Sequence, residues 1–359
     1  MSTITDVARA AGVSVATVSR ALRGLDKVNP ETRARVRRVA AELEDVASPT
    51  AASLASGRTR VIGVVAPFLT RWFFSTLVSG IEKTLRQYGH HVLLFDLEDA
   101  SFDRRMRLTQ SMLWKRVDGV VVLNIPMDEQ EQALIERLDL PVVTVGNQVG
   151  HWPCVRIDDR AAMAMATDHV LDLGHTEIAY VGAVPTQSAH LQTPQDRREA
   201  FDAALAARGL TCPDEWVVES DWTAAGARRD AQPLLAGPRR PTAVVAASDE
   251  MAFGVVALAR RLGLEVPRDL TVVGVDDHEL SDVLDLTTVR QDVDAQGRRA
   301  GEILIRQLLD EDSSPPPATT LPVELVVRGS TGPPPTTVRT TPGRDRDKGG
   351  CHHTGPSTG

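Results

Sequence analysis

The sequence predicts a chain of two structural classes, a small all-α domain at its start and a larger α/β domain of doubly wound parallel sheets. Residues 1–45 carry helix-capping signals and no strand-like apolar run. From Val61 onward, short apolar runs alternate with amphipathic helical stretches, which is the pattern of βαβ units. This alternation continues for about 270 residues, which is enough for two similar lobes.

Capping residues predict three short helices in the first domain. Ser, Thr and Asn side chains accept hydrogen bonds from the first helical turn, and proline fits the first helical position. Gly12 is expected to end the first helix, because glycine tolerates the left-handed conformation common there. The predicted caps and helices are Thr3 before residues 4–11, Ser14 before 15–22, and Asn29-Pro30 before a helix that reaches about Leu43.

The α/β domain is predicted from runs that are apolar at consecutive positions, as in parallel strands covered on both faces. The expected strands are 61–66, 92–95, 119–123, 141–145, 177–182, 242–247 and 270–275. Helical periodicity between these runs places helices near 74–88, 104–116, 160–173, 197–208, 249–262 and 293–310.

Composition and periodicity together set the expected domain boundaries. The segments are a first domain over 1–46, a linker over 47–60 with a marginal helix at 48–57, lobe one over about 61–159 and 290–320, and lobe two over about 160–289 and 321–330. Residues 331–359 are rich in Pro, Gly and Thr, so we expect a disordered tail. Cys351-His352-His353 in that tail could bind a metal, but the sequence predicts neither a metal site nor a cofactor.

Charge is unevenly distributed along the chain. The net charge is −8, yet residues 1–60 hold ten basic and six acidic side chains, so this segment is +4 and the rest is −12. Such a basic head is typical of a polyanion-binding module, and chance clustering on solvated faces is the alternative. Three dispersed cysteines form no disulfide framework, and neither an export signal nor an apolar run of about 20 residues is seen. We therefore expect a cytoplasmic protein without a membrane partner.

Residues 4–22 have the spacing of a helix-turn-helix motif. Ala8 is small where two helices must cross closely, and Gly12 provides the turn between them. The buried face is expected to consist of Val7, Val13, Val18 and Leu22. The outward residues divide into three that can meet base edges and three hydroxyl residues suited to phosphates: Val15, Ala16 and Arg20, and Ser14, Thr17 and Ser19. A generic helical hairpin is the alternative interpretation of this spacing.

Further short motifs occur in order along the chain. They are Val28-Asn-Pro-Glu-Thr-Arg33, Ile62-Gly-Val-Val, Val117-Asp-Gly119, Leu173-Gly-His175, Ala247-Ser-Asp-Glu-Met-Ala-Phe-Gly254, Val266-Pro267, Val273-Gly-Val-Asp-Asp277, Leu286-Thr-Thr-Val289 and Val327-Arg-Gly-Ser330. With these motifs, nearly all of residues 2–330 resembles the lactose/galactose-repressor (LacI/GalR) family of transcriptional regulators. The resemblance implies an all-α helix-turn-helix domain plus an α/β two-lobed, periplasmic-binding-protein-like sensor domain. It also implies a homodimeric repressor that reads a near-palindromic double-stranded operator and responds to a small effector held between the lobes.

By position, the resemblance implies specific DNA contacts. Val15, Ala16 and Arg20 would face bases in the major groove, and an arginine suits the O6/N7 edge of guanine. The DNA backbone would be held by Ser14, Thr17, Ser19, Thr32 and Arg33. Leu54 lies where the family's hinge helix places a leucine in the minor groove. The hinge departs from the family pattern: Glu44-Asp45-Val46-Ala47-Ser48 replaces Gly-Tyr-x-Pro-Asn, and Ala52 replaces a common Arg.

The resemblance also points to residues of an effector site. Arg197 would donate hydrogen bonds and Asp276 would accept them from paired hydroxyls, while aromatic rings would meet the apolar face of a sugar or a base. The full set is Phe73, Phe74, Asp159, Arg197, Trp222, Ser248 and Asp276. We therefore expect a hydroxyl-rich effector such as a sugar or sugar derivative. The alternatives are a core role for Phe74, capping or bracing roles for Asp249 and Asp277, and a solvated position for Arg198.

Two other functions fit an α/β chain of this size. A solute-binding protein for transport would share the two lobes, but it would need an export signal and no helix-turn-helix. An α/β enzyme would carry a recognisable motif, and the sequence has no GxGxxG after its first strand, no GxxxxGK[ST], no HExxH and no nucleophile elbow. The sequence therefore favours a DNA-binding regulator without enzymatic activity.

Overall fold

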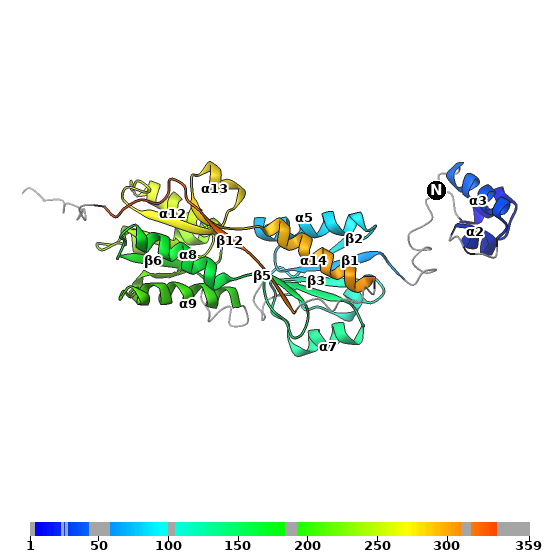
Figure 1. Cartoon of the computed structure of the whole chain (residues 1–359), viewed down its shortest axis with the longest axis horizontal. Coiled ribbons are helices and arrows are strands. Elements are labelled where there is room, and N and C mark those ends of the chain that lie inside the picture. Colours follow the sequence, from blue (N-terminus) through cyan, green and yellow to red (C-terminus); the bar gives the residue numbers. More distant parts are fainter. Residues whose placement is uncertain are drawn as a thin grey trace, which may run out of the picture. The chain divides into compact units, whose positions relative to one another are not determined.

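The structure is a computed structural model of the chain (Figure 1), and it describes residues 4–22, 25, 28–42, 58–99, 105–183, 192–309 and 317–335. The described residues comprise a helical head and an α/β part that divides into two compact units. Each part is considered by itself.

The described residues of the head form three helices: α1 (Ile4–Ala11), α2 (Val15–Leu22) and α3 (Pro30–Glu42). They bury a small apolar core in which Val7, Val18 and Val36 are fully covered. Ala8 also lies in this core, and Val13 and Leu22 are partly buried against it. The predicted helices and buried face are confirmed.

Unit 1 contains a six-stranded sheet in the order β11-β5-β4-β3-β1-β2, in which every neighbouring pair is parallel. Apolar clusters cover both faces of the sheet, which explains the continuous apolar strands. Its elements are β1 (Val61–Ala66), α5 (Trp72–Gln87), β2 (His91–Asp96), α6 (Gln110–Leu113), β3 (Gly119–Leu123), α7 (Glu129–Arg137), β4 (Val142–Val145), β5 (Cys154–Ile157), α14 (Val293–Leu308) and β11 (Ala318–Leu321).

Helices α5 and α14 lie side by side on one face of this sheet (Figure 1), and two glycines allow their close approach. A Cβ atom on Gly80 would lie 2.3 Å from the Asp294 carbonyl oxygen. A Cβ on Gly297 would lie 2.3 Å from the Leu77 carbonyl oxygen. The backbones therefore meet at a distance that only glycine permits.

Unit 2 contains a second six-stranded sheet in the order β12-β10-β9-β8-β6-β7. Its neighbouring pairs are parallel except β10 with β12, which is antiparallel. Its elements are α8 (Asp159–Asp172), β6 (Ile178–Gly182), α9 (Gln192–Ala207), the 3-10 turn η1 (Asp214–Trp216), β7 (Val217–Glu219), α10 (Ala224–Asp230), α11 (Gln232–Ala236), β8 (Ala243–Ala246), α12 (Asp249–Arg261), β9 (Thr271–Asp276), α13 (Glu279–Val283), β10 (Thr287–Gln291) and β12 (Val323–Val326).

Apart from Gln192 and Thr193 at the start of α9, which group with unit 1, the chain passes between the units after Asp158, after Gln291 and after Pro322. These crossings differ by one or two residues from the expected lobe boundaries at 159/160, 289/290 and 320/321. A larger difference is that the predicted tail begins too early. The His175 ring hydrogen bonds the Gly332 carbonyl oxygen at 2.8 Å, and the His169 ring lies 3.0 Å from the Thr331 hydroxyl. Residues 331–335 therefore belong to unit 2, and 336–359 lie outside the described residues.

The expected helix over 104–116 is wrong for residues 105–109, which are not helical, and only α6 forms within it. The physical reason is a buried ion pair. Arg105 donates to both carboxylate oxygens of Glu131, at 2.8 and 2.5 Å, and the Leu108 backbone N–H donates to the same carboxylate at 3.0 Å. These bonds hold the segment in an extended path.

Among the described helices, none combines the length and apolar character that crossing a membrane would require.

Candidate DNA-binding and effector-binding sites

The turn between α1 and α2 has the geometry that the sequence predicts. Gly12 has a φ of +66°, in the left-handed region that favours glycine. Ser14 caps α2, because its hydroxyl accepts the Thr17 backbone N–H at 3.1 Å. The two hydroxyls of Ser14 and Thr17 lie 2.8 Å apart. These bonds orient the start of α2 and keep both hydroxyl groups at its N-terminal end.

The outer face of α2 carries the residues predicted to read bases. Val15, Ala16 and Arg20 are all exposed, and 43% of the Val15 surface is accessible although it is apolar. Val18 is fully buried on the opposite face of the helix. Ser19 is partly buried and also takes part in an interaction. The structure thus brings the three predicted base-reading residues onto one open helical face.

Thr32 and Arg33, the two residues of α3 predicted to contact DNA phosphates, lie in its first turn and are half-buried. Asn29 caps this turn by accepting the Glu31 backbone N–H at 2.9 Å. Arg33 has a partner inside the head, since its Nη2 donates to the Leu25 carbonyl oxygen at 2.6 Å. Its guanidinium therefore also fastens the loop between α2 and α3. Leu54, Glu44, Asp45, Ala47 and Ala52 of the predicted hinge lie outside the described residues.

In unit 2, Arg197 occupies the centre of a polar cluster at the carboxyl ends of the strands. Its Nε donates to Asp159 Oδ1 at 2.7 Å, and its Nη2 lies 2.7 Å from the same oxygen. Its Nη1 donates to the carbonyl oxygen of Ala247, just beyond β8. Burial alone would lower the pKa of Arg197, but the charge and the hydrogen bond of Asp159 oppose this effect, and the pKa is raised. Arg197 is therefore a buried, charged and anchored guanidinium.

Asp276, the last residue of β9, adds a buried carboxyl group to this cluster. Gln291 Nε2 donates to its Oδ1 at 2.6 Å. Burial raises the pKa of Asp276 to about 8, in spite of the opposing charge of Arg197. Its φ of 136° is rare for any residue except glycine. Backbone strain of this kind is concentrated at functional sites.

Trp222 and Ser248 complete the predicted residues of unit 2. The Arg197 guanidinium carbon lies 5.9 Å from the centre of the Trp222 ring, and Trp222 has a φ of +64°. Ser248 is buried and caps α12, because its hydroxyl accepts the Met251 backbone N–H at 3.3 Å. The structure therefore brings Asp159, Arg197, Trp222 and Asp276 together and gives Ser248 a structural role.

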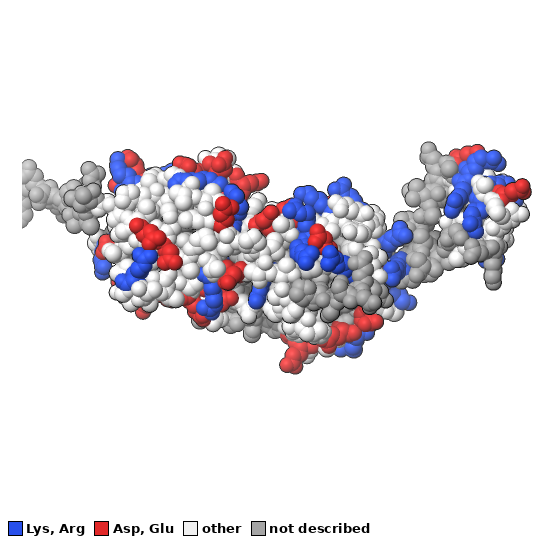
Figure 2. Space-filling model, viewed as in Figure 1, with Lys and Arg blue, Asp and Glu red and all other residues white. Residues whose placement is uncertain are grey.

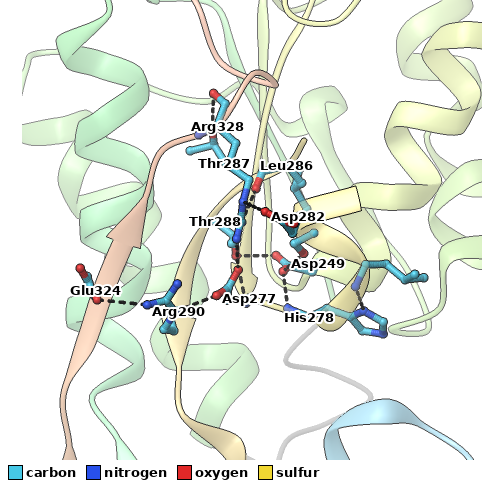
Figure 3. A network of polar contacts seen from close by, with 12 residues as sticks. Asp249, Asp277, His278, Asp282, Leu286, Thr287, Thr288, Arg290, Glu324 and Arg328 are labelled. Atoms are coloured by element: carbon cyan, nitrogen blue, oxygen red, sulfur yellow. Dashed lines mark hydrogen bonds and ion pairs between the residues drawn. The ribbon is translucent and has the colours of Figure 1, made fainter. Parts of the chain in front are cut away.

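Asp249 is buried next to this cluster and braces a loop, as the alternative interpretation proposed. It accepts hydrogen bonds from the Thr288 hydroxyl at 2.6 Å and the His278 backbone N–H at 2.9 Å (Figure 3). It also accepts one from the Ser281 hydroxyl at 2.6 Å. Burial raises its pKa to about 6. Two of these bonds tie α13 to the start of α12.

Asp277 makes a second brace in the same network (Figure 3). Arg290 Nε donates to one of its oxygens at 2.7 Å and Arg328 Nη2 to the other at 2.8 Å. Burial alone would raise the pKa of Asp277, but the two arginines lower it. Arg328 also donates to the Leu286 carbonyl oxygen at 2.8 Å. Asp277 therefore joins β10 and the segment after β12, and the sequence alone does not show this pairing.

Phe73 and Phe74 lie in the first turn of α5 in unit 1. Phe74 is buried in the apolar cluster under this helix, while Phe73 is half-buried and packs edge-on against it, with ring centres 5.3 Å apart. The core role weighed for Phe74 thus matches its burial. Arg198 is partly exposed and pairs with Asp202 at 2.8 Å, as a solvated neighbour would.

Basic side chains are numerous on the head. Figure 2 shows them gathered on part of its visible face, beside a few acidic side chains and a broad uncharged area. On α3, Arg35, Arg37 and Arg38 are exposed. The head is thus the part of the described chain best suited to a polyanion.

Within the described part of the chain, no group of three or more His, Cys, Asp or Glu residues could hold a metal ion.

Two family models match parts of this chain. The family described as bacterial regulatory proteins, lacI family, matches residues 3–45, and a periplasmic binding protein-like domain matches residues 167–331. Catabolite control protein A of Priestia megaterium is 33% identical over 338 residues, which are 92% of this chain and 99% of that protein. The repressor CytR of Escherichia coli K12 is 31% identical over 338 residues, or 92% of this chain and 96% of CytR.

Solved structures show the same fold. The Lac repressor dimer bound to operator and the anti-inducer ONPF has a TM-score of 0.80 and 26% identity, covering 92% of this chain and 99% of that chain. The complex of the transcriptional regulator CelR with cellobiose has a TM-score of 0.67 and 27% identity, covering 92% and 100%. With these relatives aligned along nearly their whole length, the chain belongs to the lacI family of bacterial transcriptional regulators.

Proposed function

We propose that this chain is a homodimeric repressor that binds a near-palindromic operator and whose DNA affinity changes when a small hydroxyl-rich effector, such as a sugar or sugar derivative, binds. The observation that carries the effector proposal is the cluster of buried Arg197 and Asp276 with the half-buried Trp222 ring beside the guanidinium. A guanidinium and a carboxyl group suit hydroxyl groups, and an indole suits an apolar ring face. Because its target is chromosomal DNA, the proposed place of action is the cytoplasm.

The position of the cluster supports this proposal. Asp276 ends β9, Ala247 follows β8 and Trp222 follows β7, so the cluster lies where open α/β sheets bind ligands. The base-reading face of α2 belongs to a different part of the chain. Effector binding and DNA binding should therefore be separable by mutation, with Phe73 a further proposed effector contact on the basis of the family resemblance.

The test of this function is operator binding with and without effector. An operator is first selected from random DNA by the full-length protein, and a panel of sugars and nucleosides is then screened for a change in affinity. Asp276→Ala should still bind the operator but lose the response, because a ligand shifts DNA affinity only through its differential binding to the protein states. Glu215→Ala, an exposed carboxylate in the same unit, is the control and should keep the response. A full response in Asp276→Ala would remove this residue from the site.

For the dimer, we propose α13 as part of the contact. Asp249 holds this helix through Ser281 and His278, and the helix exposes 45% of Leu280 and 75% of Val283. Fixed, exposed apolar side chains are typical of a protein interface. Val283→Glu should therefore weaken self-association at least tenfold in sedimentation equilibrium. Leu262→Glu changes another exposed apolar residue of unit 2 and should leave the dimer intact.

A further inference from the structure

Arg197 is paired so closely that its positive charge is already balanced. Only 4% of the residue is exposed, and its Nε and Nη2 both lie 2.7 Å from Asp159 Oδ1. Asp159 is itself well covered, with 11% of its side chain exposed. An arginine and a carboxylate at this distance in a buried environment are strongly coupled, and removing either one leaves an uncompensated charge.

The neighbouring cations on α8 and α9 are also balanced. Arg160 lies 2.8 Å from Asp196 and also pairs with Glu199, and Arg198 pairs with Asp202 at 2.8 Å. The cluster itself contains one arginine and two acidic side chains, Asp159 and Asp276. The described residues of unit 2 around Arg197 therefore offer no surplus positive charge to a ligand.

We propose that Asp159 is a specificity-determining residue, which neutralises Arg197 so that the cluster accepts uncharged hydroxyl-bearing ligands and excludes phosphorylated or carboxylated ones. This inference rests on the proposed function and narrows its effector class. A phosphate or carboxylate group at Arg197 would face Asp159 at close range, and like charges in a buried site repel strongly. A hydroxyl group has no such penalty and can both donate and accept hydrogen bonds.

The inference predicts what happens when Asp159 loses its charge. Asp159→Asn keeps the size of the side chain but removes the carboxylate that lies 2.7 Å from the buried guanidinium, so a small anion should take the place of that carboxylate. The probe is sodium sulfate, compared with sodium chloride at equal ionic strength, and the readout is thermal unfolding of the full-length protein. Sulfate should raise the Tm of Asp159→Asn by about 3–8 °C more than that of the wild type, with saturation.

Three further proteins make the result specific. Asp159→Glu keeps a carboxylate and should behave as the wild type. Asp159→Asn combined with Arg197→Met should lose the extra sulfate effect, because no guanidinium remains. General effects of sulfate on protein hydration, and binding to the basic head, are common to all the proteins and cancel in the comparison. If sulfate raises the Tm of Asp159→Asn no more than it raises the Tm of the wild type, the proposed role of Asp159 is overturned.

A measurement on the wild type covers the case in which Asp159→Asn does not fold. Hydrogen exchange of the amides of α8 and α9 is followed with and without sulfate, and Arg197→Met serves as the reference. Adding sulfate should not slow hydrogen exchange in the wild type, with saturation, any more than it does in Arg197→Met. A larger saturable effect of sulfate in the wild type would show that the native cluster accepts anions. Neither measurement requires a known effector. The failure of this inference is thus distinct from the failure of the proposed function, which the operator titration reports.

Discussion

Asp276→Asn tests the prediction that Asp276 holds a proton in the folded protein. Burial raises the pKa of Asp276 to about 8, whereas an aspartate in an unfolded chain titrates at about 3.9. A group whose pKa is raised by folding stabilises the fold fully below its unfolded pKa. This stabilisation is lost as the pH rises toward the folded pKa. An asparagine at this position cannot titrate, yet its side-chain oxygen can still accept the hydrogen bond from the Gln291 amide.

The size of the effect follows from proton counting. Between about pH 5 and pH 7, folded Asp276 carries one proton that the unfolded chain has released, so the free energy of unfolding falls by about 1.4 kcal/mol per pH unit. Over this interval, the wild type should lose about 2–3 kcal/mol relative to Asp276→Asn. Asp249 also has a raised pKa, but it is present in both proteins. Their difference therefore reports mainly on Asp276.

The assay must report on unit 2 alone, because a chain with several domains need not unfold in one step. Native-state hydrogen exchange of the β8 and β9 amides, corrected for the intrinsic pH dependence of exchange, gives this local free energy. Glu215→Gln is the control and should follow the wild type at every pH. If the difference between the wild type and Asp276→Asn stays constant from about pH 5 to pH 7, then folded Asp276 is ionised and the reasoning is refuted.

Three other changes probe the head and the core. Gly297→Ala should destabilise unit 1 by about 1–3 kcal/mol in urea unfolding, because its Cβ would meet the Leu77 carbonyl oxygen at 2.3 Å; unchanged stability would show that α14 can shift. Arg20→Ala should reduce discrimination between operator and random DNA by about 1–3 kcal/mol, measured by fluorescence anisotropy, and an equal loss on both DNAs would reduce Arg20 to a phosphate contact. Arg33→Ala should weaken binding to both DNAs similarly and flatten the salt dependence. It should also lower the stability of the head by about 1 kcal/mol through the lost bond to Leu25, and a head of unchanged stability would count against that bond.

Strands with continuous apolar sequence could be predicted from the sequence, and those with polar residues could not. The runs at Val61–Ala66 and Gly119–Leu123 are apolar throughout and form β1 and β3 as expected. Strands β5 and β10 to β12 were missed because Thr, Arg, Gln or Glu interrupt their apolar residues, and β7 was missed because it has only three residues. Helix α7 was also missed, although Asp128 and Glu131 form a capping box that the sequence displays.

The candidate site was predictable as a set of residue types but not as a set of pairs. The family resemblance brought Arg197, Asp159 and Asp276 together, yet it treated each of them as a ligand contact. The pairing of Arg197 with Asp159 spans 38 positions and depends on how α8 and α9 pack, which no local pattern encodes. Ser248 shows the same limit, because a serine before a helix can be a cap as well as a ligand contact.

The order in which the chain is synthesised has a consequence for unit 1. Its α14 and β11 emerge from the ribosome only after most of unit 2 has been made, and about 200 residues separate α5 from α14. At bacterial translation rates this interval lasts about 10–40 s. During that time the face of α5 that carries Leu77 and Ile81 lacks its α14 cover and is open to chaperones or to aggregation. A nonsense mutation after Gln291 would therefore leave unit 1 without a complete core, although the DNA-reading head would already have been translated intact.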